Sequence, residues 1–168
     1  MGNPRRASRG RIPASEESSA HQTSQQKGVA HHKSGEVGEL AFLHKAASLG
    51  FALSLPYGHI TCYDFIVDAG RNLWRVQVKT VSFLDRGLYH VGIRRSASPK
   101  TQAYTESDID FVVVYISPEK TWYVLPVREV VGCQSFLFRP KGYARRDPYA
   151  HYREAWHLLR QPDGLVFG

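Results

Sequence analysis

Two stretches, Tyr-Asp-Phe-Ile-Val-Asp (residues 63–68) and Leu-Trp-Arg-Val-Gln-Val-Lys-Thr (residues 73–80), flank Ala-Gly-Arg-Asn (residues 69–72). Both stretches are rich in β-branched and aromatic residues, and the break between them contains a glycine. This pattern predicts two antiparallel β-strands joined by a tight turn.

The pairing of the two strands brings Asp64 and Gln77 together. In an antiparallel pair the numbers of facing residues have a constant sum. One register places Asp64 opposite Val76, and a shift of one residue places it opposite Gln77. In either register Asp64 is a neighbour of Gln77, at about 5 Å.

The same hairpin predicts a polar patch on one sheet face. Gln77 and Lys79 are two residues apart, so their side chains leave the same face of the strand. Val76 and Val78 then point the other way, into a core. A carboxylate from Asp64, an amide from Gln77 and an ammonium from Lys79 therefore gather on one patch.

The composition indicates one globular domain with a basic balance. The 168 residues carry a net charge of +7, which suits a polyanionic partner such as nucleic acid. Apolar runs stay below the roughly 18 residues of a membrane span, so no membrane partner is expected. Two cysteines, Cys62 and Cys133, do not make a disulfide framework, and we expect a cytoplasmic protein.

The chain opens with a segment in which apolar residues are only scattered. Residues 1–32 hold five basic and two acidic residues among Ser, Gln, Gly and Pro, so we expect a disordered basic tail. A helix is predicted over residues 35–49, with Ser34 as N-cap. Its apolar residues suggest one broad face of Val37, Leu40, Ala41 and Ala47, and a second stripe of Glu39, Leu43 and Ala46.

Short strands and a closing helix follow. The patterns predict strands at residues 51–55, 88–94, 121–127 and 136–138, a buried strand at 110–117, and a mobile loop at 97–108. Asp147 and Pro148 are expected to begin a closing helix over 149–159. The layout is α+β or mixed α/β, a mainly antiparallel meander of strands flanked by helices.

The polar patch has the chemistry of a magnesium site. Mg²⁺, or Mn²⁺ in its place, binds carboxylates, neutral oxygens and substrate phosphate. Asp64 offers a carboxylate, Gln77 an amide oxygen and Val78 its backbone carbonyl. Glu39 adds a second acid if its helix packs over the sheet. Lys79 is then placed to neutralise a phosphoryl oxygen or to hold an attacking water.

The order of these residues resembles a known family. Gly38-Glu39 on a helix, Tyr63-Asp64, and Val76-Gln-Val-Lys79 resemble the PD-(D/E)xK nuclease superfamily. Within it the chain is similar to the group I intron-associated endonucleases, in which Gln replaces the second acid. The likeness runs from about Lys33 to Val131 and includes the segments at 75–80, 109–115 and 122–127. The closing segment at 152–159 also resembles a recurring end in that family.

The resemblance implies a restriction-endonuclease-like core over residues 33–132, followed by a C-terminal extension over 133–168. It implies that Glu39, Asp64, Gln77 and Lys79 form the active site, with Glu36 a weaker substitute for Glu39. The implied activity is metal-dependent hydrolysis of double-stranded DNA. Because one such site cuts one strand, a two-fold homo-oligomer is expected.

Basic residues provide candidate DNA contacts. Two lie at the end of the strand at 88–94 and four in the C-terminal extension: Arg94, Arg95, Arg139, Lys141, Arg145 and Arg146. Two alternatives stay open. One is a junction-resolving or repair nuclease on the same fold. The other is a DNA-binding protein that keeps the fold without cleaving, because the neutral Gln77 removes one negative charge from the metal site.

Overall fold

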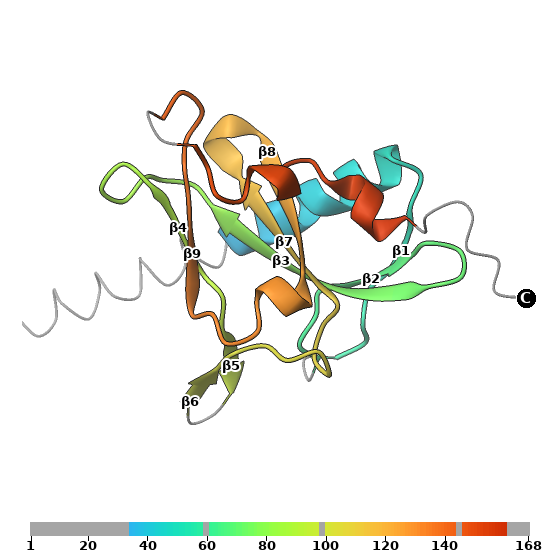
Figure 1. Ribbon diagram of the computed structural model, residues 1–168. Helices are drawn as coiled ribbons and strands as arrows, with labels where there is room; N and C mark the ends of the chain where they lie inside the picture. The colour runs from blue at the N-terminus through green and yellow to red at the C-terminus, as the bar shows by residue number, and fades with distance from the viewer. Residues whose placement is uncertain (1–33, 59–60, 98–99, 144–145, 161–168) are drawn as a thin grey trace, which may run out of the picture. The chain divides into compact units, whose positions relative to one another are not determined.

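The computed structural model describes residues 34–58, 61–97, 100–143 and 146–160 (Figure 1). The expected tail over residues 1–32 lies outside the described residues. The described segments belong to one compact unit that begins at Ser34. Within the described segments, no helix has the length and apolar character needed to cross a membrane.

A five-stranded mixed sheet forms the centre of the unit. Its strands lie in the order β1-β2-β3-β7-β8. Neighbours pair antiparallel except β3 and β7, which are parallel. The expected meander is therefore wrong at its centre, while the mixed sheet is confirmed. The strands are β1 (Ala52–Ser54), β2 (Phe65–Asp68), β3 (Leu73–Val81), β7 (Phe111–Ile116) and β8 (Thr121–Pro126).

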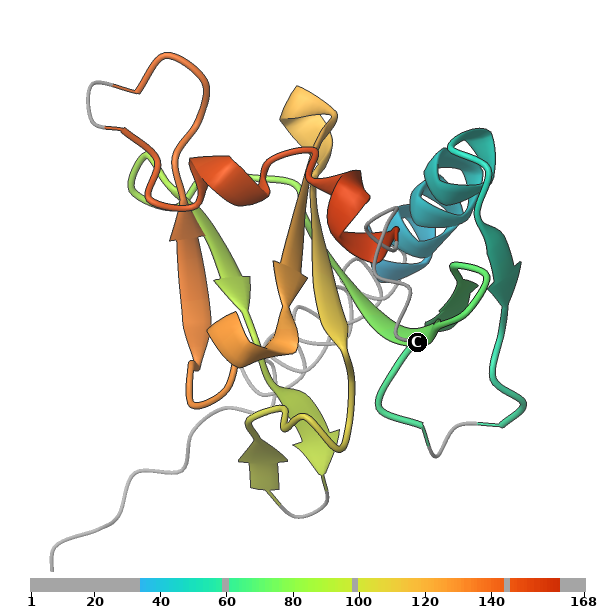
Figure 2. The same ribbon diagram turned by 45° about the vertical axis from the view of Figure 1, so that its right-hand side comes forward.

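Two small antiparallel ribbons complete the strands. One pairs β4 (Tyr89–Gly92) with β9 (Ser135–Phe138), and the other pairs β5 (Arg95–Ala97) with β6 (Lys100–Gln102). The second ribbon projects beside the sheet, where the sequence predicted a loop (Figure 2). That prediction is wrong for residues 97 and 100–102, because the polar composition of this stretch gives no sign that β6 pairs with β5.

Apolar residues fill both faces of the sheet. The helix over residues 34–48 packs Phe42 and Ala46 against Phe65, Val76 and Val78. The β4–β9 ribbon covers the opposite face, where it packs against residues of β7 and β8. Figure 2 shows the helix and this ribbon on opposite sides of β7 and β8. The sheet is therefore a rigid layer between two cores.

The buried side of the helix follows neither of the two predicted stripes, although it includes Ala46 of the second. Val37 and Leu40 are 59% and 67% exposed, whereas Gly38, Phe42 and Ala46 are buried. The Phe42 ring lies among aromatic partners, with its centroid 5.1 Å from that of Phe65. At Gly38 the helix approaches β3 so closely that a side chain there would meet Thr80. These contacts with distant residues outweigh the apolar pattern of the helix itself.

The closing segment is two short 3₁₀ turns, η3 (Ala150–Tyr152) and η4 (Trp156–Leu159), and not the predicted helix. The chain is extended at Arg153 and left-handed at Glu154, with φ 50°. There the Glu154 N–H donates to the Trp122 carbonyl (2.8 Å), and the Glu154 carboxylate accepts from the Trp122 N–H (3.0 Å). Pairing with the edge of β8 thus replaces the helical hydrogen bonds at this point.

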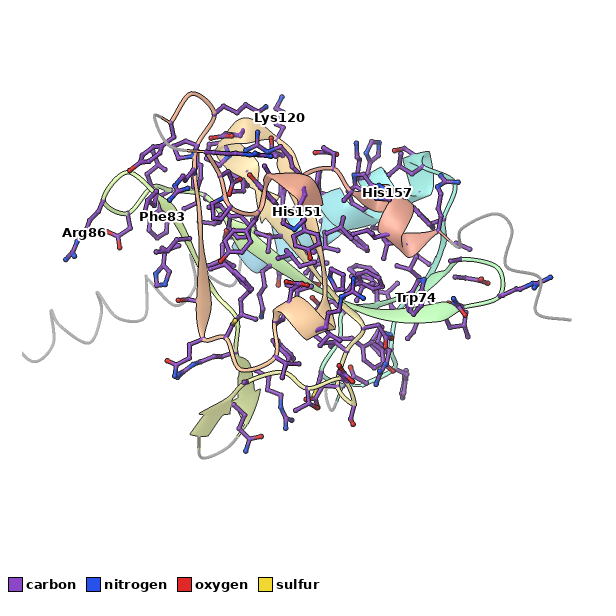
Figure 3. All side chains as sticks on the ribbon, in the orientation of Figure 1. Trp74, Phe83, Arg86, Lys120, His151 and His157 are labelled. Atoms are coloured by element: carbon purple, nitrogen blue, oxygen red, sulfur yellow. The ribbon has the colours of Figure 1, made fainter. Side chains whose placement is uncertain are left out.

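Two short turns and one long-range hydrogen bond complete the unit. Short 3₁₀ turns η1 (Ser117–Glu119) and η2 (Val127–Glu129) flank β8. Trp74, labelled in Figure 3, lies on β3 and donates its indole N–H to the Leu159 carbonyl (3.0 Å). This bond ties the end of η4 to the sheet.

The close approach at Gly38 generates a stability prediction. An alanine Cβ there would lie 1.6 Å from Thr80 Oγ1 and 2.8 Å from Thr80 Cβ. Although alanine favours a helix interior by about 1 kcal/mol over glycine, Gly38→Ala should lower the free energy of unfolding by about 1–3 kcal/mol through overpacking. Urea denaturation measures this change.

Gly35→Ala is the matched control, because nothing lies within 4 Å of its added Cβ. We expect this variant to be at least as stable as the unmodified chain. In a Thr80→Gly background most of the cost of Gly38→Ala should disappear, since the clashing atoms are gone. Equal stability of the Gly38→Ala and Gly35→Ala variants would contradict the close contact.

Candidate active site

The candidate site begins just before the first residue of β2. Phe65 faces Val76, and the Asp64 N–H donates to the Val76 carbonyl (2.9 Å). Continuing this register places Asp64 opposite Gln77. The shifted register, one of the two predicted, is therefore the one the chain adopts.

Hydrogen bonds hold the Asp64 carboxylate against β3. Its Oδ2 accepts from the Val78 N–H (2.8 Å) and from the Gln77 side-chain amide, whose Nε2 lies 2.5 Å away. The same amide nitrogen donates to the Val78 carbonyl (3.2 Å). Asp64 Oδ2 and the Val78 carbonyl oxygen thus both accept from the Gln77 amide nitrogen, so these two oxygens point at the same place.

Burial shapes the charges of Asp64 and Lys79. Burial raises the pKa of the Asp64 carboxyl, and the Val78 N–H, the Lys79 charge and the Gln77 amide partly offset the rise. Burial lowers the pKa of the Lys79 ammonium, and the charges of Asp64 and Glu39 partly offset the fall. The ionised forms of Asp64 and Lys79 therefore stabilise each other in a partly desolvated site.

Lys79 leaves the same face of β3 as Gln77, as predicted. Its Nζ lies 5.7 Å from the ring centroid of Tyr104, within the range of a cation–π contact. Tyr104 is 2% exposed and belongs to the core on this face. Tyr104 could not be predicted from the sequence. It lies in a polar stretch, and no local pattern indicates that it contacts a strand residue 25 positions away.

Glu39 is brought to the site by the first helix. It is half-buried, and its charge acts on the Lys79 ammonium. Glu36, one turn earlier, is exposed. The glycine before Glu39 lets the helix approach Thr80, which is the neighbour of Lys79.

The oxygen ligands fit a hard divalent cation. The Gln77 amide nitrogen bridges Asp64 Oδ2 and the Val78 carbonyl, so two of the expected ligand oxygens already point at one location. Among the residues that the structure describes, no group of three or more His, Cys, Asp or Glu gathers. A set of one or two carboxylates with neutral oxygens suits Mg²⁺ or Mn²⁺ better than Zn²⁺.

A second feature that the sequence analysis missed supports β3. The Arg75 guanidinium donates to both carboxylate oxygens of Asp110, at 3.0 and 2.8 Å, and the Arg75 N–H donates to one of them at 2.7 Å. Burial opposes ionisation of Asp110, but these hydrogen bonds lower its pKa below the ordinary value. The pair fixes the start of the parallel β3–β7 contact.

Three members of the predicted basic cluster lie together. Arg139, Lys141 and Arg146 border a hollow of about 230 Å³ that Tyr143 and Arg153 also line. The Arg139 guanidinium lies 6.0 Å from the ring centroid of Tyr143 and donates to the Arg146 carbonyl. The fourth member, Arg145, lies outside the described residues.

The other two basic candidates differ from each other. Arg94 is exposed. Arg95 is half-buried: it donates to Gln102 Oε1 (2.7 Å), and its Nε lies 3.8 Å from a carboxylate oxygen of Asp108. Its guanidinium therefore helps to hold the β5–β6 ribbon against the following turn.

Comparison with known proteins agrees with this geometry. The model of the PD-(D/E)XK endonuclease family matches residues 29–159. A solved structure of the bacterial homing endonuclease I-Ssp6803I is similar, with a TM-score of 0.69 and 28% sequence identity, covering 76% of this chain and 91% of that chain. No protein with a curated description matches. The sheet and helix are thus a restriction-endonuclease-like core, and the chain belongs to the PD-(D/E)XK endonuclease family.

Proposed function

We propose that the chain is a divalent-metal-dependent endonuclease of the homing or intron-associated type that hydrolyses phosphodiester bonds in double-stranded DNA. The observation that carries the proposal is the convergence of the Asp64 carboxylate and the Val78 carbonyl on one point beside the Lys79 ammonium. The similar solved structure is described as a bacterial homing endonuclease, which supports the type.

The proposed roles follow from the positions of the side chains. In phosphodiester hydrolysis a water oxygen bonds to phosphorus, an ester oxygen leaves, and negative charge grows on the phosphoryl oxygens. Lys79 provides positive charge and hydrogen-bond donors for that growing charge. Asp64, Val78 and Glu39 would hold a Mg²⁺ or Mn²⁺ ion through oxygen atoms, and Gln77 would join them once its amide rotates to present the oxygen in place of the nitrogen that now faces Asp64 and Val78. When bound, such an ion polarises the phosphoryl oxygen and makes water a better nucleophile.

A metal-dependent cleavage assay tests the proposal. The substrate is a DNA duplex recovered from a randomised pool by binding to the full chain, here termed the target duplex. We expect cleavage with Mg²⁺ or Mn²⁺ and no cleavage with excess EDTA. Binding of the target duplex without cleavage under any of these conditions would contradict the proposal and favour a DNA-binding protein.

Substitution of the two charged residues should separate catalysis from binding. Asp64→Ala and Lys79→Ala should each lower the single-turnover cleavage rate by about 10²–10³-fold, the usual cost of losing an electrostatic contact to the transition state. The fold should persist, because the core contacts of β3 come from Val76 and Val78. Asp64→Ala should bind the target duplex at least as tightly, since a negative charge near the phosphates is removed.

Asp85→Ala is the control for these variants, because Asp85 is an exposed carboxylate in the turn between β3 and β4. It should cleave at the rate of the unmodified chain. Circular dichroism checks that each variant is folded. Folded Asp64→Ala and Lys79→Ala variants that cut at the unmodified rate would rule out this active site.

We also propose that Arg139, Lys141, Arg145 and Arg146 contact DNA phosphates. Each phosphate contact contributes about 0.9 to the slope of log K against log salt. Replacing all four by alanine should therefore flatten the slope by up to about 3.6. Arg71→Ala, an exposed arginine in the β2–β3 turn, is the comparison variant. An unchanged slope in the quadruple variant would show that these residues are only solvated surface.

The proposed site also bears on assembly. One active site cuts one strand, so cleavage of a duplex through both strands calls for two copies of the chain or two successive events. We propose a two-fold homo-oligomer for the same reason.

A further inference from the structure

Tyr104 faces Lys79 from outside the helix, β2 and β3. It follows β6 and is 2% exposed. Its ring centroid lies 5.7 Å from Lys79 Nζ. A buried aromatic face at this distance attracts an ammonium through its quadrupole.

The turn that carries Tyr104 is tied to the strand that carries Lys79. The N–H and hydroxyl of Thr105 donate to Asp108 Oδ2, at 2.9 and 2.8 Å. The Arg75 guanidinium donates to the Glu106 carbonyl at 2.8 Å and also to the Ser107 carbonyl. Because Arg75 and Lys79 both belong to β3, the ring and the ammonium share one frame.

A neutral ring has an advantage over a carboxylate as the partner of this lysine. A lysine side chain is flexible, and holding its ammonium in one place costs conformational entropy. A further carboxylate beside Lys79, in addition to Asp64 and Glu39, would offset the charge that a phosphate needs, whereas an aromatic face attracts the cation and carries no net charge. Burial and the Asp64 charge raise the pKa of the Tyr104 hydroxyl far above its ordinary value, so the side chain stays neutral.

We propose that Tyr104 is a positioning residue for Lys79, whose ammonium its buried ring holds beside Asp64 without neutralising it. This inference rests on the proposed function for its catalytic consequence, but the contact itself can be tested without cleavage. The hydroxyl is not required by the proposal, and the aromatic face is.

The first test is the nuclear magnetic resonance spectrum of the full chain labelled with ¹³C at the lysine ε carbons. Protons above an aromatic face are shifted upfield, so the Lys79 Hε signals, assigned with Lys79→Arg, should lie upfield of those of exposed lysines. The shift should remain in Tyr104→Phe and disappear in Tyr104→Leu. Tyr89→Leu is the matched control, because Tyr89 is 4% exposed and belongs to the same core. This variant should keep the shift.

The second test is single-turnover cleavage of the target duplex by the same variants. Tyr104→Leu should lose about 3- to 30-fold in rate, the range that a cation–π contact provides. Tyr104→Phe should cut within about 3-fold of the unmodified rate, and Tyr104→Leu should bind the duplex unchanged. If Tyr104→Leu does not fold, 3,4,5-trifluorophenylalanine at position 104 keeps a ring of similar shape with a weakened negative face, and it should show the same loss relative to Tyr104→Phe.

The outcomes of the two tests are distinguishable. A Lys79 signal that is unshifted in the unmodified chain, or one that stays upfield in Tyr104→Leu, overturns the inference. So does a Tyr104→Phe variant that cuts as slowly as Tyr104→Leu. An unmodified chain that never cuts overturns the proposed function, while the spectrum still decides whether the ring holds the ammonium.

Discussion

The hydrogen bond from the Val78 N–H to the Asp64 carboxylate (2.8 Å) is the contact on which the site depends. β2 begins at Phe65, so Asp64 lies just before the strand. There the Asp64 carboxylate accepts the Val78 N–H in place of a backbone carbonyl of a neighbouring strand. A buried N–H without a partner is costly, and a buried carboxylate without a donor is more so. Each group thus requires the other, and the requirement fixes Asp64 against the middle of β3.

The rest of the fold keeps that contact rigid. Val76 and Val78 are buried in the core beneath the first helix, and the parallel partner β7 supports β3 along its other edge. The Arg75–Asp110 pair closes the start of this parallel contact. Charged groups that act on a reacting bond must be held closely in place, and a strand packed on both faces is better suited to this than a loop.

Local sequence patterns were sufficient for the hairpin and for the patch on its face. Alternation alone predicts that Gln77 and Lys79 share a face, and the turn length limits the partners of Asp64 to neighbouring positions. The buried strand predicted at 110–117 corresponds to β7. Its parallel pairing with β3 was not, because local patterns contain no information about which distant strand lies alongside.

The features that local patterns did not predict have the same origin. The inward face of the first helix is set by the space at Gly38 above Thr80, a contact between residues far apart in the sequence. The closing helix is interrupted because Glu154 pairs with Trp122 at the edge of β8. Tyr104 was missed for this reason as well. In each case tertiary packing outweighed a plausible local pattern.

The most direct measurement of the central claim, that Asp64, Gln77 and Val78 form one divalent-cation site beside Lys79, is paramagnetic broadening by Mn²⁺. Mn²⁺ is titrated into the ¹⁵N-labelled full chain while its assigned amide signals are followed. The signals of residues 64 and 77–79 should broaden first, and Asp64→Asn should abolish this selective effect. Broadening that begins elsewhere, or that is the same in Asp64→Asn, would contradict the account.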